Sequence, residues 1–414
     1  MKIVHFADTH IDMVSQGKRD PSSGLPIRVL DFLKALDTIV DTAIQERADF
    51  ALFAGDAYRD RTPVPTFQRE FGKRIMRLSA AHVPTLLLVG NHDLSPAFGR
   101  AHALQEFETL QVPYVRVSRI PELLGPDELF GVPLQVLTLP WLSRSGLMNA
   151  KEPAGDSANT IYADMEMAVN DTVEKLLAMA RPDLPLVLAA HATVQGALWG
   201  GERSVMLGSD LVLSGSLVRN PRFSYVALGH IHKAQNLNEG AQPPVVYPGS
   251  IERVDFGEVA DEKKFVIAHL QPGEATRVEW RKLHGRRFIE RSVKVEKPEE
   301  IMPACLDALP EPDELRDAIV KLSVEYPHEY EALLDETELR RRAENAFEFH
   351  FLRRPQMKSR VRLPDNQSLT SLSPLEMLDV YWRTMQAPTQ SMDELKKLAA
   401  ELLSQSMQSA ADTE

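Results

Sequence analysis

Short apolar runs alternate with segments of helical periodicity through the first two-thirds of the chain, and this alternation limits the possible folds. Between the first two runs, Val29, Leu33 and Leu36 follow a spacing of roughly 3.6 residues, which predicts an amphipathic helix. Short apolar strands separated by helices predict an α/β core with strands buried on both faces. The runs occupy residues 3–7, 50–54, 85–89, 135–139, 186–190 and 225–228.

Nearly every apolar run ends in a polar residue that can bind a metal ion. A strand that merely ends would be followed as often by Lys, Ser or Pro, so five such endings are difficult to attribute to chance. In α/β sheets, ligands bind beyond the carboxyl ends of the strands, so we expect these side chains to converge on one crevice. The endings are Asp8, Asp56 after Gly55, Asn91 after Gly90, His191, and His230 after Gly229.

These residue types suit hydrolysis of a phosphodiester with the help of two divalent cations. Such a site needs hard oxygen ligands, imidazole nitrogens and one carboxylate that bridges the ions, because the cations activate water and clamp the phosphate oxygens. The glycines let the backbone turn tightly and place the next side chain over the crevice. The sequence supplies these groups in five blocks: Asp8-x-His10, Gly55-Asp56, Gly90-Asn91-His92-Asp93, His191, and Gly229-His230-x-His232.

Taken together and in this order, the blocks resemble the calcineurin-like metallophosphoesterase family, although any one block alone is weak. The resemblance implies a mixed-sheet α/β sandwich with two overlapping ligand sets: Asp8, His10, Asp56 and His232 for one ion, and Asp56, Asn91, His191 and His230 for the other. In the catalytic set, His92 would face the scissile phosphate and Asp93 would orient His92. Mixed imidazole and carboxylate ligation suits manganese, iron or zinc better than calcium, and the family favours Mn²⁺.

A second motif narrows the resemblance. Residues 246–258, VYPGSIERVDFGE, followed by KKFVI at residues 263–267, are similar to the SbcD-type nuclease subunits, bacterial counterparts of the Mre-type repair nucleases. A strand, a Pro-Gly turn and a second strand would explain Pro248 and Gly249 but not the rest. The resemblance implies a metal-dependent exonuclease and endonuclease for DNA ends, hairpins and single strands, a homodimer, and an SbcC-like coiled-coil ATPase as partner.

One departure from these relatives follows Asp56. Some of them place a histidine, linked to exonuclease action, where this chain has Tyr58-Arg59-Asp60. The balance between exonuclease and endonuclease activity is therefore left open by the sequence.

The residue composition of the chain changes near residue 281, and this change predicts a protein of three parts. We expect a phosphoesterase (nuclease) domain at residues 1–280, a small α+β capping domain that binds DNA at 281–362, and a helical partner-binding segment at 370–414. Within the capping domain, a strand is expected near residues 318–324 and a charged helix near 336–347.

The C-terminal segment contains two expected helix starts, Ser373 with Glu376 and Ser391 with Glu394, which fit the capping box. Both helices carry an apolar stripe but have little core of their own, which favours a partner surface. The stripes are Leu375, Leu378, Tyr381 and Trp382 on one helix, and Leu395, Leu398 and Leu402 on the other.

Two basic stretches, residues 281–294 and 353–362, have two interpretations of equal weight. They form either a solvated surface, as charge runs usually do, or a track for the DNA backbone. The loop at residues 16–19 has the same alternatives. The histidines outside the blocks are expected to be packed or solvated, and His5, inside the first strand, to support the site from below.

Bulk properties place the protein in a broad class. A length of 414 residues predicts two or three domains, and 43% hydrophobic with 26% charged residues is ordinary for a globular protein. A net charge of −12 does not exclude a local basic track. The single cysteine, Cys305, and the lack of a signal peptide favour the cytoplasm. No apolar run is long enough for a membrane span, so none is expected.

Two other functions remain possible from the sequence. A phosphoesterase for nucleotides or nucleotide sugars would share every metal ligand, but the long chain, basic segments and helical tail argue against it. A scaffold with the same fold but no turnover would be expected to lack a ligand, and none is missing.

Overall fold

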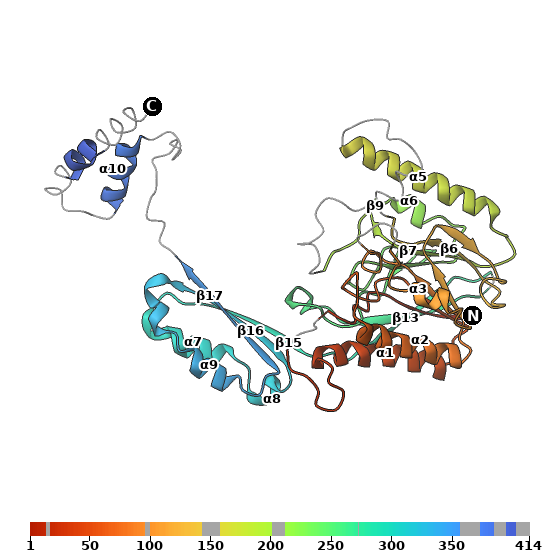
Figure 1. Cartoon of the computed structure of the whole chain (residues 1–414), viewed down its shortest axis with the longest axis horizontal. Helices are drawn as coiled ribbons and strands as arrows, with labels where there is room; N and C mark the ends of the chain where they lie inside the picture. The colour runs from red at the N-terminus through yellow and green to blue at the C-terminus, as the bar shows by residue number, and fades with distance from the viewer. Residues whose placement is uncertain are drawn as a thin grey trace. The chain divides into compact units, whose positions relative to one another are not determined.

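The structure, a computed structural model, describes residues 1–13, 17–95, 100–142, 158–200, 212–271, 273–356, 373–384 and 395–402. Contacts between residues divide the chain into two compact units, Met1–Phe288 and Ile289–Glu414. Figure 1 shows the helices and strands of both units.

Within the described residues, the first unit contains two six-stranded mixed sheets. Strand β1 (Lys2–Phe6) pairs in parallel with β2 (Phe50–Phe53) and antiparallel with β13 (Lys264–His269). In spatial order, the first sheet consists of β14 (Arg277–Lys282), β13 (Lys264–His269), β1 (Lys2–Phe6), β2 (Phe50–Phe53), β3 (Thr85–Leu88) and β4 (Val115–Ser118). The second consists of β11 (Gln235–Asn236), β12 (Val245–Tyr247), β10 (Tyr225–Gly229), β7 (Leu186–His191), β6 (Gln135–Leu139) and β5 (Glu122–Leu124). Strands β8 (Thr193–Val194) and β9 (Val212–Leu213) form a separate pair.

Alternating side chains show how the layers are stacked. In β2, Ala51 and Phe53 pack in a core with the helices, whereas Phe50 and Leu52 pack in a core shared by the two sheets. Helices α1 (Ile27–Gln45), α2 (Pro65–Ala80) and α3 (Gln105–Thr109) contribute to the core of the first sheet. Helices α5 (Ala158–Met179) and α6 (Gly215–Val218) contribute to that of the second. The unit is a sandwich of two sheets with helices outside, which confirms the predicted fold (Figure 1).

Each of the six predicted apolar runs is a strand, and the predicted amphipathic helix is α1. Helix α1 buries one face, including Val29, Leu33 and Leu36, against the first sheet. Helix α2 begins with Pro65, whose fixed φ and missing N–H suit the first helical position.

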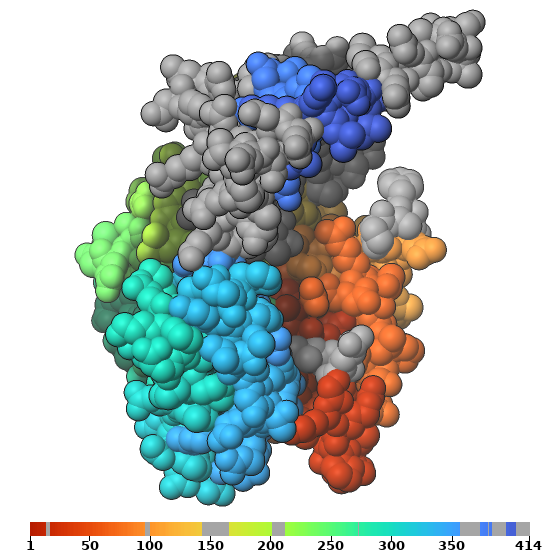
Figure 2. Space-filling model, turned by 90° about the vertical axis from the view of Figure 1, so that its left-hand side faces the viewer, coloured from red at the N-terminus to blue at the C-terminus, as the bar shows by residue number. Residues whose placement is uncertain are grey.

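The second unit combines a three-stranded sheet with short helices. The sheet has the order β15 (Phe288–Lys294), β16 (Ile319–Pro327), β17 (Glu348–Gln356), and β16 and β17 are parallel. Alternate residues of β16, from Val320 to Tyr326, pack in a core with Cys305 and Leu339. These come from α7 (Ile301–Ala308) and α9 (Glu336–Arg342), and α8 (Pro312–Leu315) adds Leu315. Figure 2 shows the surface of this unit in cyan to blue.

Two boundaries differ from the sequence-based ones. The predicted division at 280/281 falls inside β14, which pairs with β13 over six residues and so belongs to the first unit. Helix α9 ends at Arg342 rather than near residue 347, because the chain turns there toward β17.

The described part of the C-terminal segment is helical. Helix α10 (Pro374–Thr384) begins with the predicted capping box, since Ser373 N–H donates to Glu376 at 2.7 Å and Glu376 N–H to Ser373 Oγ at 3.4 Å. Residues 395–402 are also helical, while the capping box expected at Ser391 lies outside the described residues. Among the helices whose residues the structure describes, none combines the length and apolarity that crossing a bilayer needs.

Candidate metal centre

Strands from both sheets bring the predicted ligands to one edge of the sandwich. Neighbouring strands β1, β2 and β3 are followed by Asp8 and His10, by Asp56, and by Asn91, respectively. In the second sheet, β7 ends at His191, and its neighbour β10 is followed by His230 and His232. The carboxyl ends of these parallel strands lie together, as expected for an α/β sheet.

The backbone at this edge is strained. Four predicted ligands have positive φ: Asp8 (51°), His10 (37°), Asp56 (63°) and His230 (99°). L-residues rarely adopt this region, at a cost on the order of 1–3 kcal/mol each, and such strain concentrates at functional sites.

The glycines before the ligands serve two different needs. Gly55 has φ 99° and makes the tight turn that the sequence predicts. A Cβ at Gly90 would lie 2.1 Å from Asp56 Oδ1, and one at Gly229 would lie 2.1 Å from the carbonyl oxygen of Ala54. At these two positions glycine is required by the close approach of neighbouring chain segments.

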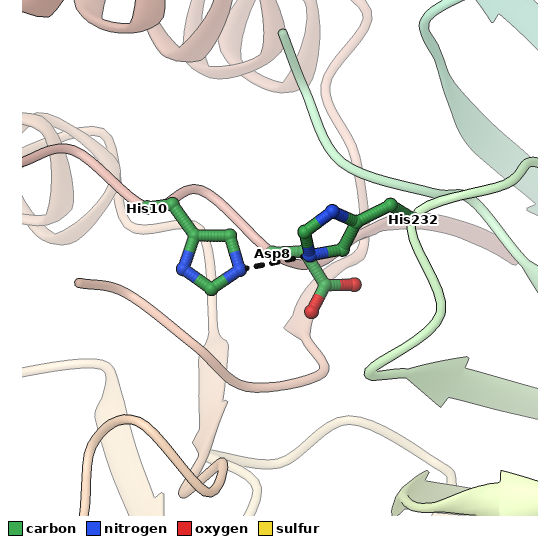
Figure 3. Close-up of side chains that lie close together, drawn as sticks. All are labelled: Asp8, His10 and His232. Atoms are coloured by element: carbon green, nitrogen blue, oxygen red, sulfur yellow. Dashed lines mark hydrogen bonds between the residues drawn. The ribbon is translucent and has the colours of Figure 1, made fainter. Parts of the chain in front are cut away.

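Asp8, His10 and His232 form the first donor set, with one ligand atom of each within 4.8 Å of the others. Figure 3 shows the two rings turned toward each other beside the carboxylate. His10 Nε2 and His232 Nε2 lie 3.0 Å apart. His10 Nδ1 lies 3.3 Å from the carbonyl oxygen of Tyr58, and His232 Nδ1 lies 2.7 Å from Glu258 Oε1. When both Nδ1 atoms donate, two Nε2 lone pairs face each other, an arrangement that a shared cation stabilises.

Asp56, His191 and His230 form the second donor set. His191 Nδ1 contacts the carbonyl oxygen of Ala54 at 2.7 Å, which leaves Nε2 3.4 Å from Asp56 Oδ2. The amide oxygen of Asn91 lies 2.9 Å from His191 Nε2 and 3.0 Å from His230 Nδ1. Asp56 Oδ2 is also 3.9 Å from His10 Nε2, so this carboxylate lies between the two donor sets.

Burial shapes the electrostatics of the centre. It raises the pKa of Asp8 to about 7. Burial would also raise the pKa of Asp56, but His191 and its neighbouring imidazoles outweigh it and hold that pKa well below the usual range. Conversely, Asp56 overcomes burial to raise the pKa of His191 to about 9. Buried carboxylates and imidazoles at this density need positive charge among them, and the mixed oxygen and nitrogen donors fit two divalent metal ions.

Asp93 differs from the sequence-based prediction. Its buried carboxylate does not orient His92 but accepts from the N–H groups of Asp56, Ala57 and Gly90, each at 2.9 Å. His92 is instead held through Nδ1, 2.6 Å from the carbonyl oxygen of Arg59. Asp93 therefore fixes the turns that carry Asp56 and Asn91, because the backbone after β2 and the backbone after β3 both offer N–H groups to this buried carboxylate.

The segment Tyr58-Arg59-Asp60 supports the centre through its backbone. The carbonyl groups of Tyr58 and Arg59 contact His10 and His92, and the N–H groups of Arg59 and Asp60 donate to Asp12 at 2.6 and 3.1 Å. Sequence reasoning missed this role, because a contact through backbone atoms leaves no mark on residue type.

Three further side chains near the centre were not given roles from the sequence. Glu258 holds His232, and Trp141 and Trp199 pack against His230 with ring centroids 4.9 and 6.1 Å away. Glu258 lies in the second motif, so the motif was a signal for it. The histidine expected below the site, His5, contacts Tyr225 and Leu228 of β10, and burial lowers its pKa to about 3.

The fold and the two donor sets define a metallophosphoesterase. Residues 1–234 match the calcineurin-like phosphoesterase family, and the chain belongs to this family. It is 25% identical to the DNA double-strand break repair protein Mre11 of Archaeoglobus fulgidus over 71% of this chain and 63% of the relative. It is 27% identical to the SbcD subunit of the nuclease SbcCD of Staphylococcus epidermidis over 66% of each chain, and also to that of Rhodobacter capsulatus, over 67% of this chain and 68% of the relative.

These matches span about two thirds of the length of the relatives. Two solved structures are similar to 68% of the chain. One is TT1561 of Thermus thermophilus, with 16% identity over 99% of that chain and a TM-score of 0.39. The other is a dimetal phosphatase from Danio rerio, with 12% identity over 96% of that chain and a TM-score of 0.40.

Proposed function

We propose that this protein is a metal-dependent DNA nuclease, with exonuclease and endonuclease activity, that works in the cytoplasm as the nuclease subunit of an SbcCD-like repair complex. The observation that carries the proposal is the pair of adjacent donor sets with Asp56 between them. The relatives, named as Mre11 and as the SbcD subunit of the nuclease SbcCD, support DNA as the substrate.

The proposed centre holds two divalent ions, by preference Mn²⁺. Asp8, His10, His232 and Asp56 would bind one, and Asp56, Asn91, His191 and His230 the other. When bound, the ions would supply a hydroxide nucleophile from water and neutralise charge on the phosphate.

His92 is the proposed catalytic residue. Its Nδ1 is occupied by the carbonyl oxygen of Arg59, and its ring packs edge-on at 5.2 Å from that of His10. Nε2 is thereby directed to the substrate, where it can donate a proton to the oxygen that leaves phosphorus. Asp93 keeps this geometry by holding the backbone of Asp56 and Gly90.

Trp141 and Trp199 support a substrate with unpaired bases. Both are partly buried and lie against His230, so each has a ring close to the phosphate-binding centre. Aromatic faces next to a phosphodiester site can stack on splayed bases of a single strand or hairpin.

The two basic stretches differ in how their cations are paired, and this decides where DNA contact is proposed. In the first basic stretch, Arg281, Lys282, Arg286 and Lys294 pair with carboxylates, which favours the solvated-surface interpretation there. In the second stretch, Arg353 pairs with Glu331 and Glu336, while Arg354 is exposed on β17. We place phosphate contact on these two arginines, where DNA would compete with the two glutamates.

The SbcC-like ATPase would bind the C-terminal helices, and the chain would form a homodimer through its phosphoesterase domain. Helix α10 and residues 395–402 expose apolar side chains that a partner can cover: Leu375, Met377, Tyr381, Leu395, Leu398 and Leu402.

The test is incubation of the purified chain with end-labelled hairpin and linear DNA, with and without Mn²⁺. Shortened products that require Mn²⁺ are expected, and their lengths separate exonuclease from endonuclease action. Intact DNA together with hydrolysis of nucleotides would overturn the proposal in favour of a small-molecule phosphoesterase. Intact DNA without any hydrolysis would indicate a scaffold.

A further inference from the structure

The second motif, at residues 246–258, folds around one predicted metal ligand. Ser250 N–H donates to the carbonyl oxygen of His232 at 3.1 Å. Gly249, at φ 80°, brings the motif so close that a Cβ would lie 2.4 Å from that oxygen. The Pro-Gly turn is therefore shaped by its contact with the backbone of His232 as well as by the strand that precedes it.

The end of the motif holds the side chain of the same histidine. Glu258 is 1% exposed, and its Oε1 lies 2.7 Å from His232 Nδ1. Its Oε2 accepts from Val254 N–H at 2.9 Å and lies 2.8 Å from Lys263 Nζ. Lys263 is 2% exposed and donates to Ser250 Oγ at 2.7 Å. His232 is thus fixed through its ring and its backbone by one short segment.

A contribution to the stability of the fold does not by itself explain why this ion pair is buried. Desolvation of a buried pair consumes most of the Coulomb energy, and apolar residues of similar volume are often as stable or more so. The carboxylate has a specific effect on His232, because it accepts a hydrogen bond from Nδ1–H and so directs the Nε2 lone pair toward His10 and Asp8. The Nδ1 atoms of His10 and His191 contact backbone carbonyl oxygens, whereas His232 Nδ1 contacts a carboxylate.

We propose that Glu258 is a positioning residue for metal binding, kept in place by Lys263, and that it sets the tautomer and orientation of His232. This inference rests on the proposed metal centre. It gives a role to the part of the motif that a strand-turn-strand arrangement does not explain.

The test measures Mn²⁺ affinity of the full chain from the free-ion signal in electron paramagnetic resonance. In Glu258→Gln, one of two Mn²⁺ ions should bind about 10–100-fold more weakly. The matched control is Glu279→Gln, because Glu279 contacts His269 Nε2 at 3.0 Å where β13 pairs with the start of β1, at the opposite end of that strand from Asp8. The control should bind both ions as the wild type does. Wild-type affinity in Glu258→Gln would overturn the proposal.

A double variant separates positioning from core stability. Glu258→Gln with Lys263→Met removes both charges, so no unpaired buried ammonium remains, and the urea midpoint should return toward the wild-type value. Affinity for the affected ion should stay low, because the carboxylate on His232 is still missing. Recovery of affinity together with stability would show a merely structural pair and overturn the inference.

Failure of the positioning role can be distinguished from failure of the proposed nuclease function. If the wild type binds two Mn²⁺ ions but leaves DNA intact, the nuclease proposal fails, while loss of affinity in Glu258→Gln still supports the positioning role. If the wild type cleaves DNA and Glu258→Gln binds Mn²⁺ normally, only the positioning role fails.

Discussion

Asp56 connects the two donor sets through one carboxylate. Its Oδ2 lies 3.4 Å from His191 Nε2 and 3.9 Å from His10 Nε2, and its Oδ1 accepts from His92 N–H at 2.8 Å. We expect Asp56→Ala to lower Mn²⁺ content below two ions per chain and to reduce DNA cleavage by about 1000-fold or more, since charge stabilisation of several kcal/mol is lost. Metal analysis and a cleavage assay measure both effects.

A companion variant controls for the strained backbone. Asn tolerates positive φ better than most residues, so Asp56→Asn should keep the fold while it removes the bridging charge. Full manganese occupancy in both variants would contradict the bridging role.

His92→Ala tests turnover separately from binding. The ring lies beside the donor sets rather than within them, so Mn²⁺ content and DNA affinity should remain, while cleavage falls about 10²–10⁴-fold through loss of a proton donor. The control is His82→Ala, because His82 stacks on Tyr114 before β3, at the opposite end of that strand from Asn91. Undiminished cleavage by His92→Ala would remove His92 from the mechanism.

Residue types predicted which side chains gather at the centre, but not how each is held. The seven predicted ligands lie at or just after strand ends that meet, because position after a buried strand fixes location in an α/β sheet. Asp93 was misassigned, since a carboxylate next to His92 in sequence is directed instead to backbone N–H groups that follow β2. Contacts made by the carbonyl groups of Tyr58 and Arg59 are independent of side chain and so invisible to sequence patterns.

At the scale of elements, the two periodicities in the sequence predicted the strands and α1, because burial against a sheet imposes them. Strand β14 was not predicted as part of the first sheet. Its residues, RVEWRK, are mostly half-exposed at the sheet edge, so the basic composition suggested a new domain. Pairing with β13 places it in the first unit.

The ends of β2 and β10 pack closely at Gly229. A Cβ at Gly229 would lie 2.1 Å from the backbone oxygen of Ala54, so Gly229→Ala must separate β10 from the end of β2 and should destabilise the fold by about 1–3 kcal/mol. Gly72→Ala is the control, because a Cβ there meets nothing within 4 Å in α2 and should stabilise by about 0.5–1 kcal/mol. Urea midpoints measure both, and equal midpoints for the two variants would contradict the packing argument.

For the whole molecule, the chain divides into two compact units after Phe288, so the change in composition near residue 281 comes before the division and lies within the first unit. The first unit buries its apolar residues in three cores, and the second has a core of its own. The described residues of the C-terminal helices, which belong to the second unit, contribute to none of these four cores. Tyr381 is 51% exposed and Leu398 is 55% exposed, and α10 has only 11 residues, a length at which an isolated helix is marginal in water. The marginal stability of α10 and the exposed apolar side chains of both helices agree with the proposed binding of a partner.

The exposed apolar side chains of the C-terminal helices predict the effect of removing residues 370–414. A chain without residues 370–414 should keep Mn²⁺-dependent cleavage of single strands, because the donor sets lie in the first unit, but should lose association with the SbcC-like ATPase in a pull-down. In the full chain, Tyr381→Ala with Leu398→Ala should weaken association at least about tenfold, since each buried side chain contributes roughly 1.5–3 kcal/mol. Leu110→Ala, at a residue 73% exposed in the first unit, controls for loss of exposed apolar surface and should bind normally. If the truncated chain still binds the ATPase, the interface does not lie in residues 370–414.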